Sequence, residues 1–221
     1  MERSTVMLEP GTYGRAELFA ILGAKDKTAL ERKMKRYGII FASSGWGDRL
    51  VYEIKELRDP FKVFAIIEFG YDGNTDFRKL RLFYHHYFND EYFMTMPDEV
   101  KETLLRKVDK TLSRQTIAKY TQRLVSHNYV ERNTNNYIYY FAFHDEQRKV
   151  EREEYSRAWS EYWTAIKSGA GYHETIWNMI DKYGGVARKQ AIPEINGIYN
   201  EKIEQMKTYI HQSIENEIQE H

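Results

Sequence analysis

The spacing of apolar positions predicts two short helices near the start of the chain. An apolar stripe that begins at Leu18 recurs at helical intervals, and Gly23 ends it, because glycine readily adopts a left-handed backbone. A second helix is expected over residues 28–37, where apolar positions again recur every three or four residues. Thr28 is expected to cap it, with Glu31 completing a capping box.

Two short apolar runs follow this helix pair and predict a β-hairpin. Residues 39–42 and 50–54 flank the polar, glycine-containing segment 43–48, which has the composition of a turn. Trp46 lies in this turn and has two expected placements: exposed for a partner, or folded back onto the hairpin. The second is favoured, because an exposed tryptophan is uncommon.

The same order of elements recurs later in the chain. Apolar spacing predicts a helix over 99–108 and another over 113–127. A β-ribbon formed by 130–131 and 137–143 is expected next, with the polar sequence RNTNN (132–136) at its tip. Helix, turn, basic helix and ribbon is the layout of a winged helix-turn-helix, which places one helix in the DNA major groove.

The remaining segments are predicted to be helical. Two connecting helices are expected over 60–69 and 77–88, and C-terminal helices over 145–167, over 173–183 and from Pro193 onward. The last of these carries a one-sided isoleucine stripe. That stripe is expected either to pack against 145–183 or to form the seam of a homodimer.

The expected fold class is therefore mainly α with small β-ribbons. It contains two winged helix-turn-helix modules and a helical C-terminal region. The expected domains are an N-terminal winged helix over 1–57, connecting helices with a second winged helix over 58–144, and the helical region over 145–221.

Net charge alone does not identify a partner, but its distribution is informative. The 221 residues include 33 Lys and Arg against 33 Asp and Glu, so the chain is neutral overall. Residues 25–37 include six basic and two acidic residues, and residues 101–132 include eight basic and three acidic residues. In contrast, residues 144–221 include ten basic and fourteen acidic residues. The basic excess lies on the two predicted modules, and phosphate binding depends on such local patches.

The composition excludes several kinds of chemistry. The chain has no cysteine, so disulfides, thiolate catalysis and Cys-ligated metal sites are absent. His85 and His86 are adjacent and would point to different sides of a helix, unlike metal-binding pairs at i, i+4. No phosphate loop, serine nucleophile motif, membrane-length apolar run or secretion signal is visible. We therefore expect a non-enzymatic, cytoplasmic protein without cofactor, bound metal or membrane span.

The residues expected to contact DNA lie on the two basic helices, in the turn before the first of them, or at the ribbon tips. Arginine can bind guanine and glutamine can bind adenine through two hydrogen bonds each, whereas lysine mainly binds phosphate. The candidates are Lys25, Lys27, Thr28, Arg32, Lys33, Arg36 and Arg49 in the first module, and Arg114, Gln115, Thr116, Lys119, Arg123, Arg132, Asn133 and Asn135 in the second.

Two stretches resemble known families. TYGRAELFAILGAKDKTALERKMKRYGIIFASSGWGDRLVYEI resembles helix-turn-helix segments of proteins from phages and mobile elements of Gram-positive bacteria. SRQTIAKYTQRLVSHNYVERNTNNYIYYF resembles the winged helix of bacterial regulators and plasmid replication proteins, with Asn128 where glycine is usual. The resemblance implies a DNA-binding fold and covers less than half of the chain.

Two functional hypotheses follow. In the first, the chain is a non-enzymatic protein that binds double-stranded DNA, as a transcription regulator or replication-type factor of a mobile element. In the alternative, it is a protein-interaction module, such as a phage-borne inhibitor of a host nucleic-acid machine, because winged helices also bind proteins. The expected partners are double-stranded DNA, a second copy of the chain through its C-terminal helix, or a host protein.

Overall fold

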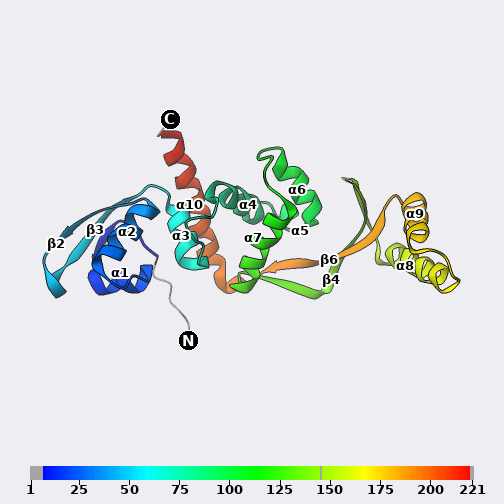
Figure 1. Cartoon of the computed structure of the whole chain (residues 1–221), viewed down its shortest axis with the longest axis horizontal. Coiled ribbons are helices and arrows are strands. Elements are labelled where there is room, and N and C mark those ends of the chain that lie inside the picture. Colours follow the sequence, from blue (N-terminus) through cyan, green and yellow to red (C-terminus); the bar gives the residue numbers. More distant parts are fainter. Residues whose placement is uncertain (1–6, 145, 220–221) are drawn as a thin grey trace. The chain divides into compact units, whose positions relative to one another are not determined.

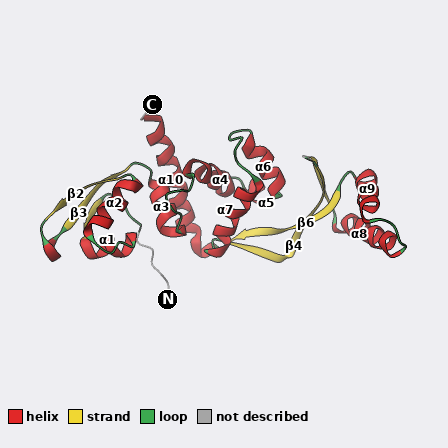
Figure 2. Cartoon of the chain, in the orientation of Figure 1, coloured by secondary structure: helices red, strands yellow, loops and turns green. Residues whose placement is uncertain are grey.

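The computed structural model describes residues 7–144 and 146–219, which form helices and two three-stranded antiparallel sheets (Figures 1 and 2). The chain divides into two compact units. The first comprises Met1–Asn89 and Ile198–His221, and the second comprises Asp90–Gly197. The last helix therefore belongs with the N-terminal part of the chain, whereas we expected it to lie in a separate C-terminal region.

The first unit begins with two helices packed on a small sheet. The strand order in this sheet is β1-β3-β2, so that β3 is central. Its core includes Leu18, Leu30, Met34 and Tyr52, all completely buried. We refer to these elements as the first module: β1 (Gly11–Gly14), α1 (Arg15–Leu22), α2 (Lys27–Tyr37), β2 (Ile39–Ser44) and β3 (Val51–Leu57).

Both helices end where the sequence predicts. Gly14 is the N-cap of α1, and Gly23 and Gly38 end α1 and α2 with φ of 58° and 79°. The prediction that Thr28 caps α2 is wrong. Asp26 is the N-cap, because its Oδ1 accepts a hydrogen bond from the Ala29 backbone N–H at 2.8 Å.

Three further helices complete the first unit: α3 (Pro60–Phe69), α4 (Phe77–Asn89) and α10 (Asn200–Gln219). The prediction for α3 is confirmed, since Asp59 caps it and Gly70 ends it. The prediction that the last helix starts near Pro193 is wrong, since α10 begins at Asn200. Its apolar stripe is buried at Ile203, Met206 and Ile210, and α10 packs against α3 and α4 instead of 145–183.

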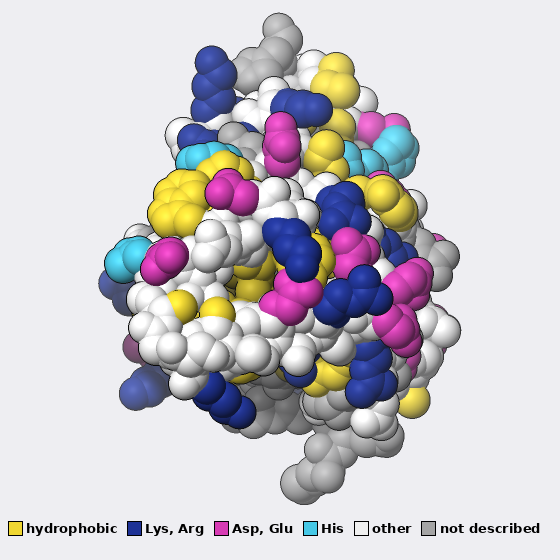
Figure 3. Space-filling model, turned by 90° about the vertical axis from the view of Figure 1, so that its right-hand side faces the viewer, with side chains coloured by type: hydrophobic (Ala, Val, Ile, Leu, Met, Phe, Trp, Pro, Cys, Tyr) yellow, Lys and Arg dark blue, Asp and Glu magenta, His cyan; other side chains and the backbone are white. Residues whose placement is uncertain are grey.

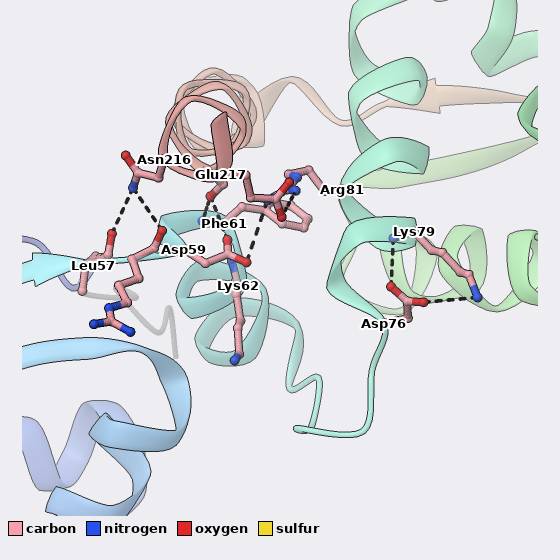
Figure 4. A network of polar contacts seen from close by, with 11 residues as sticks. Leu57, Asp59, Phe61, Lys62, Asp76, Lys79, Arg81, Asn216 and Glu217 are labelled. Carbon is pink, nitrogen blue, oxygen red and sulfur yellow. Dashed lines mark hydrogen bonds and ion pairs between the residues drawn. The ribbon is translucent and has the colours of Figure 1, made fainter. Parts of the chain in front are cut away.

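A polar network joins α10 to the start of α3 (Figure 4). The buried Ser213 hydroxyl donates to Asp59 Oδ1 at 2.7 Å and accepts from the Phe61 backbone N–H at 3.0 Å. The buried Arg81 guanidinium lies 2.5 Å from Glu217 Oε1 and 3.9 Å from Asp59 Oδ2. Because the first N–H groups of a helix have no intrahelical partner, Ser213 and Asp59 together complete the cap of α3.

The second unit contains a long ribbon with helices at both ends of its strands. Its sheet has the order β5-β4-β6, and β4 pairs with β6 from Val130↔Ile195 to Ala142↔Val186. The elements are α5 (Glu91–Thr95), α6 (Asp98–Arg106), α7 (Arg114–Ser126), β4 (Val130–Phe143), β5 (Glu146–Val150), α8 (Arg152–Lys167), α9 (Tyr172–Tyr183) and β6 (Val186–Ile195).

The predicted hairpin with RNTNN at its tip is wrong. Residues 130–143 form one strand, whose register shifts between Asn133 and Tyr137, so the polar segment is an irregularity within β4. A local hairpin is replaced because β6, far away in the sequence, pairs along nearly all of β4. The expectation of a purely helical C-terminal region is also wrong, since 146–150 and 186–195 are strands.

Between β4 and β6 the chain adds the strand β5 and the helices α8 and α9. We refer to these three elements together as the helical hairpin. Its core packs Phe141 of β4 and Ala187 of β6 against Ala158, Tyr162 and Met179. The elements α6, α7, β4 and β6 are referred to as the second module. The helical hairpin is thus an insertion between the two strands of this module's ribbon (Figure 2).

Candidate nucleic-acid interface

Helix α7 presents a polar face without any carboxylate. Ser113 caps the helix by accepting a hydrogen bond from the Thr116 N–H at 3.3 Å. Ile117, Tyr120 and Leu124 are buried and fix which side of α7 faces solvent. Apart from Arg114, the exposed residues of α7 are Gln115, Ala118, Lys119, Gln122, Arg123 and Ser126.

The turn between α6 and α7 adds positive charge next to the start of α7. Lys107 and Lys110 are exposed in this turn. Asp109 organises it, since its Oδ1 accepts hydrogen bonds from the Thr111 N–H at 2.9 Å and the Thr111 hydroxyl at 2.6 Å. The sequence-based candidates did not include Lys107, Lys110 or Gln122, although both lysines belong to the basic segment 101–132.

Arg114 has an internal partner. Its Nη1 lies 2.8 Å from Glu99 Oε1, and Arg188 Nη1 of β6 lies 2.9 Å from the same oxygen. The pair of arginines on one carboxylate therefore links α7, α6 and β6. Burial, and then the negative charge of Glu99, raises the pKa of the neighbouring Tyr140 to about 12. The ion pair with Glu99 therefore holds the start of α7 in place through Arg114. Thr116 is half-buried, and its hydroxyl lies 3.0 Å from that of Ser113.

The candidates on β4 are not gathered into a wing tip. Arg132 and Asn135 are exposed on the strand, whereas the side chain of Asn133 lies outside the described part of the chain. Beside them, Glu131 stands opposite Glu194 in the β4–β6 register. This stretch of the ribbon therefore combines positive, amide and negative groups, unlike the exposed face of α7.

In the first module, the exposed candidates lie at the start and along one side of α2. Lys25 precedes the helix, and Lys27, Thr28 and Arg32 are exposed on it. Lys27 Nζ is 3.7 Å from Glu31 Oε1, a pair open to solvent and therefore weak. Lys35, which was not among the sequence-based candidates, is also exposed on α2.

Two further candidates on α2 lie against other parts of the first unit, and Arg36 is also exposed. Lys33 Nζ donates to the Leu22 and Gly23 carbonyls at 2.8 and 2.9 Å, where it satisfies the C-terminal end of α1. The Arg36 guanidinium lies so close to Gly73 that a Cβ added there would fall 2.5 Å from its Nε. Lys33 therefore joins α1 to α2, and Arg36 packs on the loop that follows α3.

The tip of the β2–β3 hairpin is exposed. Trp46 has 92% of its surface accessible, so the favoured expectation that it folds back onto the hairpin is wrong. Arg49 is also exposed, in the short 3-10 turn Gly47–Arg49. The tip therefore presents an indole ring and a guanidinium three residues apart.

Metal and membrane sites have no counterpart in the described part of the chain. Among residues 7–144 and 146–219, no three His, Asp or Glu side chains are grouped so that they could hold a metal ion. Over the same residues, no helix combines the length and apolar character needed to cross a bilayer. On the face drawn in Figure 3, basic and acidic side chains are intermixed, with hydrophobic side chains between them.

No known protein family, curated protein or solved structure matches this chain. The candidate interface therefore rests on the contacts and exposed side chains described above.

Proposed function

We propose that this chain is a non-enzymatic protein that binds double-stranded DNA through two winged helix-turn-helix modules. Its role would be that of a transcription regulator or replication-type factor of a mobile element. The observation that carries the proposal is the exposed face of α7, which holds Gln115, Lys119, Gln122 and Arg123 and no carboxylate. A helix that only faces water gains nothing from excluding negative charge, whereas a helix against phosphates does.

The side chains on α7 suit reading of bases in the major groove. Gln115, Gln122 and Arg123 can each make paired hydrogen bonds to a base edge, and Ala118 can contact a thymine methyl group. Lys107 and Lys110 in the preceding turn would bind phosphates, which position a protein without reading sequence. Arg114 would act indirectly, because its ion pair with Glu99 orients the first turn of α7.

The first module supports the same proposal through its element order. Two helices followed by a hairpin, with β1 added beside β3, is the order expected of a winged helix. Lys27, Thr28 and Arg32 would face DNA from α2, and Arg49 would contact the backbone from the hairpin tip. Lys33 would contribute to the local positive potential while its ammonium remains bound to the α1 carbonyls, and the exposed Arg36 would add charge from the same helix.

The proposal is tested by fluorescence anisotropy with random duplex DNA over a series of salt concentrations. We compare Lys119→Ala/Arg123→Ala with Lys149→Ala/Lys167→Ala, which removes two exposed positive charges from β5 and α8. The first variant should reduce the slope of log affinity against log salt by about 0.9 for each phosphate that the protein no longer neutralises. The second variant should leave the slope unchanged.

Either of two results would contradict the proposal. One is the absence of salt-sensitive binding by the wild-type protein at micromolar concentration. The other is an equal weakening of binding in both double variants, because an interface localised on α7 cannot respond to charges on the helical hairpin. Circular dichroism on each variant checks that folding is intact.

A protein-interaction role is the second candidate, and the helical hairpin favours it. Trp163 and Trp177 are each more than half exposed there, and Tyr172 is exposed too. Tryptophan and tyrosine dominate the binding energy of protein interfaces. In this case, Trp163→Ala/Trp177→Ala should abolish capture of a host protein and leave duplex DNA binding unchanged.

A homodimer through α10 would need a different seam from the one expected. The centre of the stripe is buried within the first unit, and Ile214 and Ile218 are its exposed members. Sedimentation velocity of Ile214→Ser/Ile218→Ser against the wild type tests whether this end of α10 joins two copies.

A further inference from the structure

Trp46 differs from the other tryptophans that reach the surface. Trp177 packs edge-on against Phe143 with ring centroids 5.8 Å apart, and Trp163 stacks near Trp159 at 6.4 Å. No ring within the described residues contacts Trp46 in this way, and 92% of its surface is accessible. The indole therefore contributes little to the packing of the first module.

The turn that carries Trp46 is built to present it. Gly45 and Gly47 flank it with φ of 87° and 61°, a backbone region that favours glycine. A Cβ on Gly45 would lie 2.2 Å from the Arg49 carbonyl oxygen, so no larger residue fits there without moving the backbone. The Arg49 N–H donates to the Trp46 carbonyl at 3.1 Å, which closes the turn.

The surroundings of Trp46 favour DNA over a protein partner. Ser43, Ser44 and Arg49 are exposed beside it, its immediate neighbours are glycines, and Asp48 is the one acidic residue of segment 43–49. A protein interface needs a broad, well-packed surface around a tryptophan anchor. In contrast, an apolar wedge between base pairs is a single side chain flanked by groups that bind the backbone.

The start of α2, where Lys25 and Lys27 are exposed, lies toward the hairpin tip. α2 and β2 are joined at Gly38 and flank one shallow groove of about 410 Å³, lined by Glu31 and Lys35 on the helix and by strand residues as far as Ser43. The two elements therefore run alongside each other in opposite directions. The first turn of α2, with Lys27 and Thr28, consequently lies toward the hairpin tip.

We propose that Trp46 inserts into the minor groove of duplex DNA and stacks between base pairs, with Arg49 on a flanking phosphate. This inference rests on the proposed DNA-binding function and adds its mode of contact. Insertion unstacks one base step and kinks the duplex while α2 occupies the adjacent major groove. In this mode of binding, the contact between the hairpin tip and DNA depends on stacking more than on charge.

The test measures duplex affinity and duplex bending for Trp46→Ala, Trp46→Phe, Arg49→Ala and the control Ser44→Ala. Trp46→Ala should weaken binding about 10- to 100-fold, as expected when an aromatic–base stack is removed, and Trp46→Phe should retain most of the affinity. Because Trp46→Ala removes no charge, the salt slope should stay unchanged, whereas Arg49→Ala should reduce it by about 0.9. Energy transfer between end-labelled duplexes should show loss of the bend in Trp46→Ala alone.

The outcomes separate this inference from the function on which it rests. If the wild type binds duplex DNA with strong salt dependence and Trp46→Ala binds and bends it equally well, the inserted wedge is overturned while DNA binding stands. If Trp46→Ala weakens binding to single strands but not to duplexes, the minor-groove placement is overturned. If the wild type binds no DNA, both proposals fail together.

Discussion

The two modules share an order of elements but complete their ribbons in different ways. In the first, β2 and β3 are joined by a tight turn at Gly45–Gly47, and the hairpin ends in the exposed Trp46. In the second, β4 pairs with β6, and 42 residues (144–185) that include the helical hairpin lie between the two strands. A similar helix pair is thus followed by a bare tip in one module and by an added structure in the other.

The contrast indicates which end of a ribbon can accept an insertion. In the second module, the insertion begins after Phe143, at the end of β4 opposite the end that follows α7, so it adds structure without entering the packing of α6 against α7. In the second module, the insertion builds its own core around Phe141, Tyr162 and Met179. We therefore expect the two units to respond separately to core mutations and to alkaline pH.

Truncation of Phe141 should destabilise the protein most, because Phe141 is buried and stacked on Tyr183 with ring centroids 5.0 Å apart. Phe141→Ala should lower the free energy of unfolding by about 3–5 kcal/mol. Hydrogen exchange should speed up in α8, α9 and β6 but not in the first module. Leu30→Ala, at a fully buried site in the first module, is the reciprocal control, and equal acceleration everywhere by either variant would refute the separation.

An intermediate effect is expected at high pH, from one tyrosine in each unit. Burial, with nearby Glu99 and Glu9 respectively, raises the pKa of Tyr140 and of Tyr209 to about 12, from a usual value of 10.0. The folded state holds these protons more tightly, so this stability is present below pH 10 and is lost as the pH rises toward 12. The loss amounts to about 1.4 kcal/mol per pH unit for each tyrosine.

Urea unfolding at pH 9, 10 and 11 measures this loss. Tyr140→Phe should flatten the pH dependence of the second unit, and Tyr209→Phe that of the first, with phenolate absorbance as an independent readout. A pH dependence that neither variant alters would show that other groups are responsible.

The smallest effect compares two lysines on α2, two residues apart in the sequence. Lys33→Ala removes the ammonium bound to the Leu22 and Gly23 carbonyls and should cost about 1 kcal/mol of stability. Lys35→Ala, at an exposed position, should change stability by less than about 0.5 kcal/mol. Thermal unfolding of both variants checks this order, and equal melting temperatures would contradict a joining role for Lys33.

Elements specified by nearby residues could be predicted from the sequence. Gly23, Gly38 and Asp59 mark helix ends through their own backbone or side-chain preferences, and they do so in the structure. β6 could not be predicted, because its partner lies on a distant segment and its own sequence, with Pro193 and several charges, shows no alternation. Strand pairing of this kind depends on tertiary contacts more than on local preference.

In the candidate site too, features set by local sequence could be predicted and features set by tertiary contacts could not. The exposed face of α7 follows from helical periodicity, so Gln115, Lys119 and Arg123 could be placed in advance. The internal partners of Arg114 and Lys33 could not, since Glu99 and the α1 carbonyls are brought near them only by folding. The prediction for Trp46 was wrong because burial of an indole is favourable in general, whereas Gly45 and Gly47 form a turn in which the indole is exposed.

The polar junction between Ser213 and Asp59 bears on the order in which the chain can fold during synthesis. The second unit is continuous, so it can fold once residue 197 has left the ribosome. The start of α3 must wait for α10, which supplies the Ser213 hydroxyl to the Phe61 N–H across 152 residues of sequence. Until then, the aromatic surface of α3 and α4 lacks its covering helix, so we expect the nascent first unit to expose apolar side chains for longer than the second unit does.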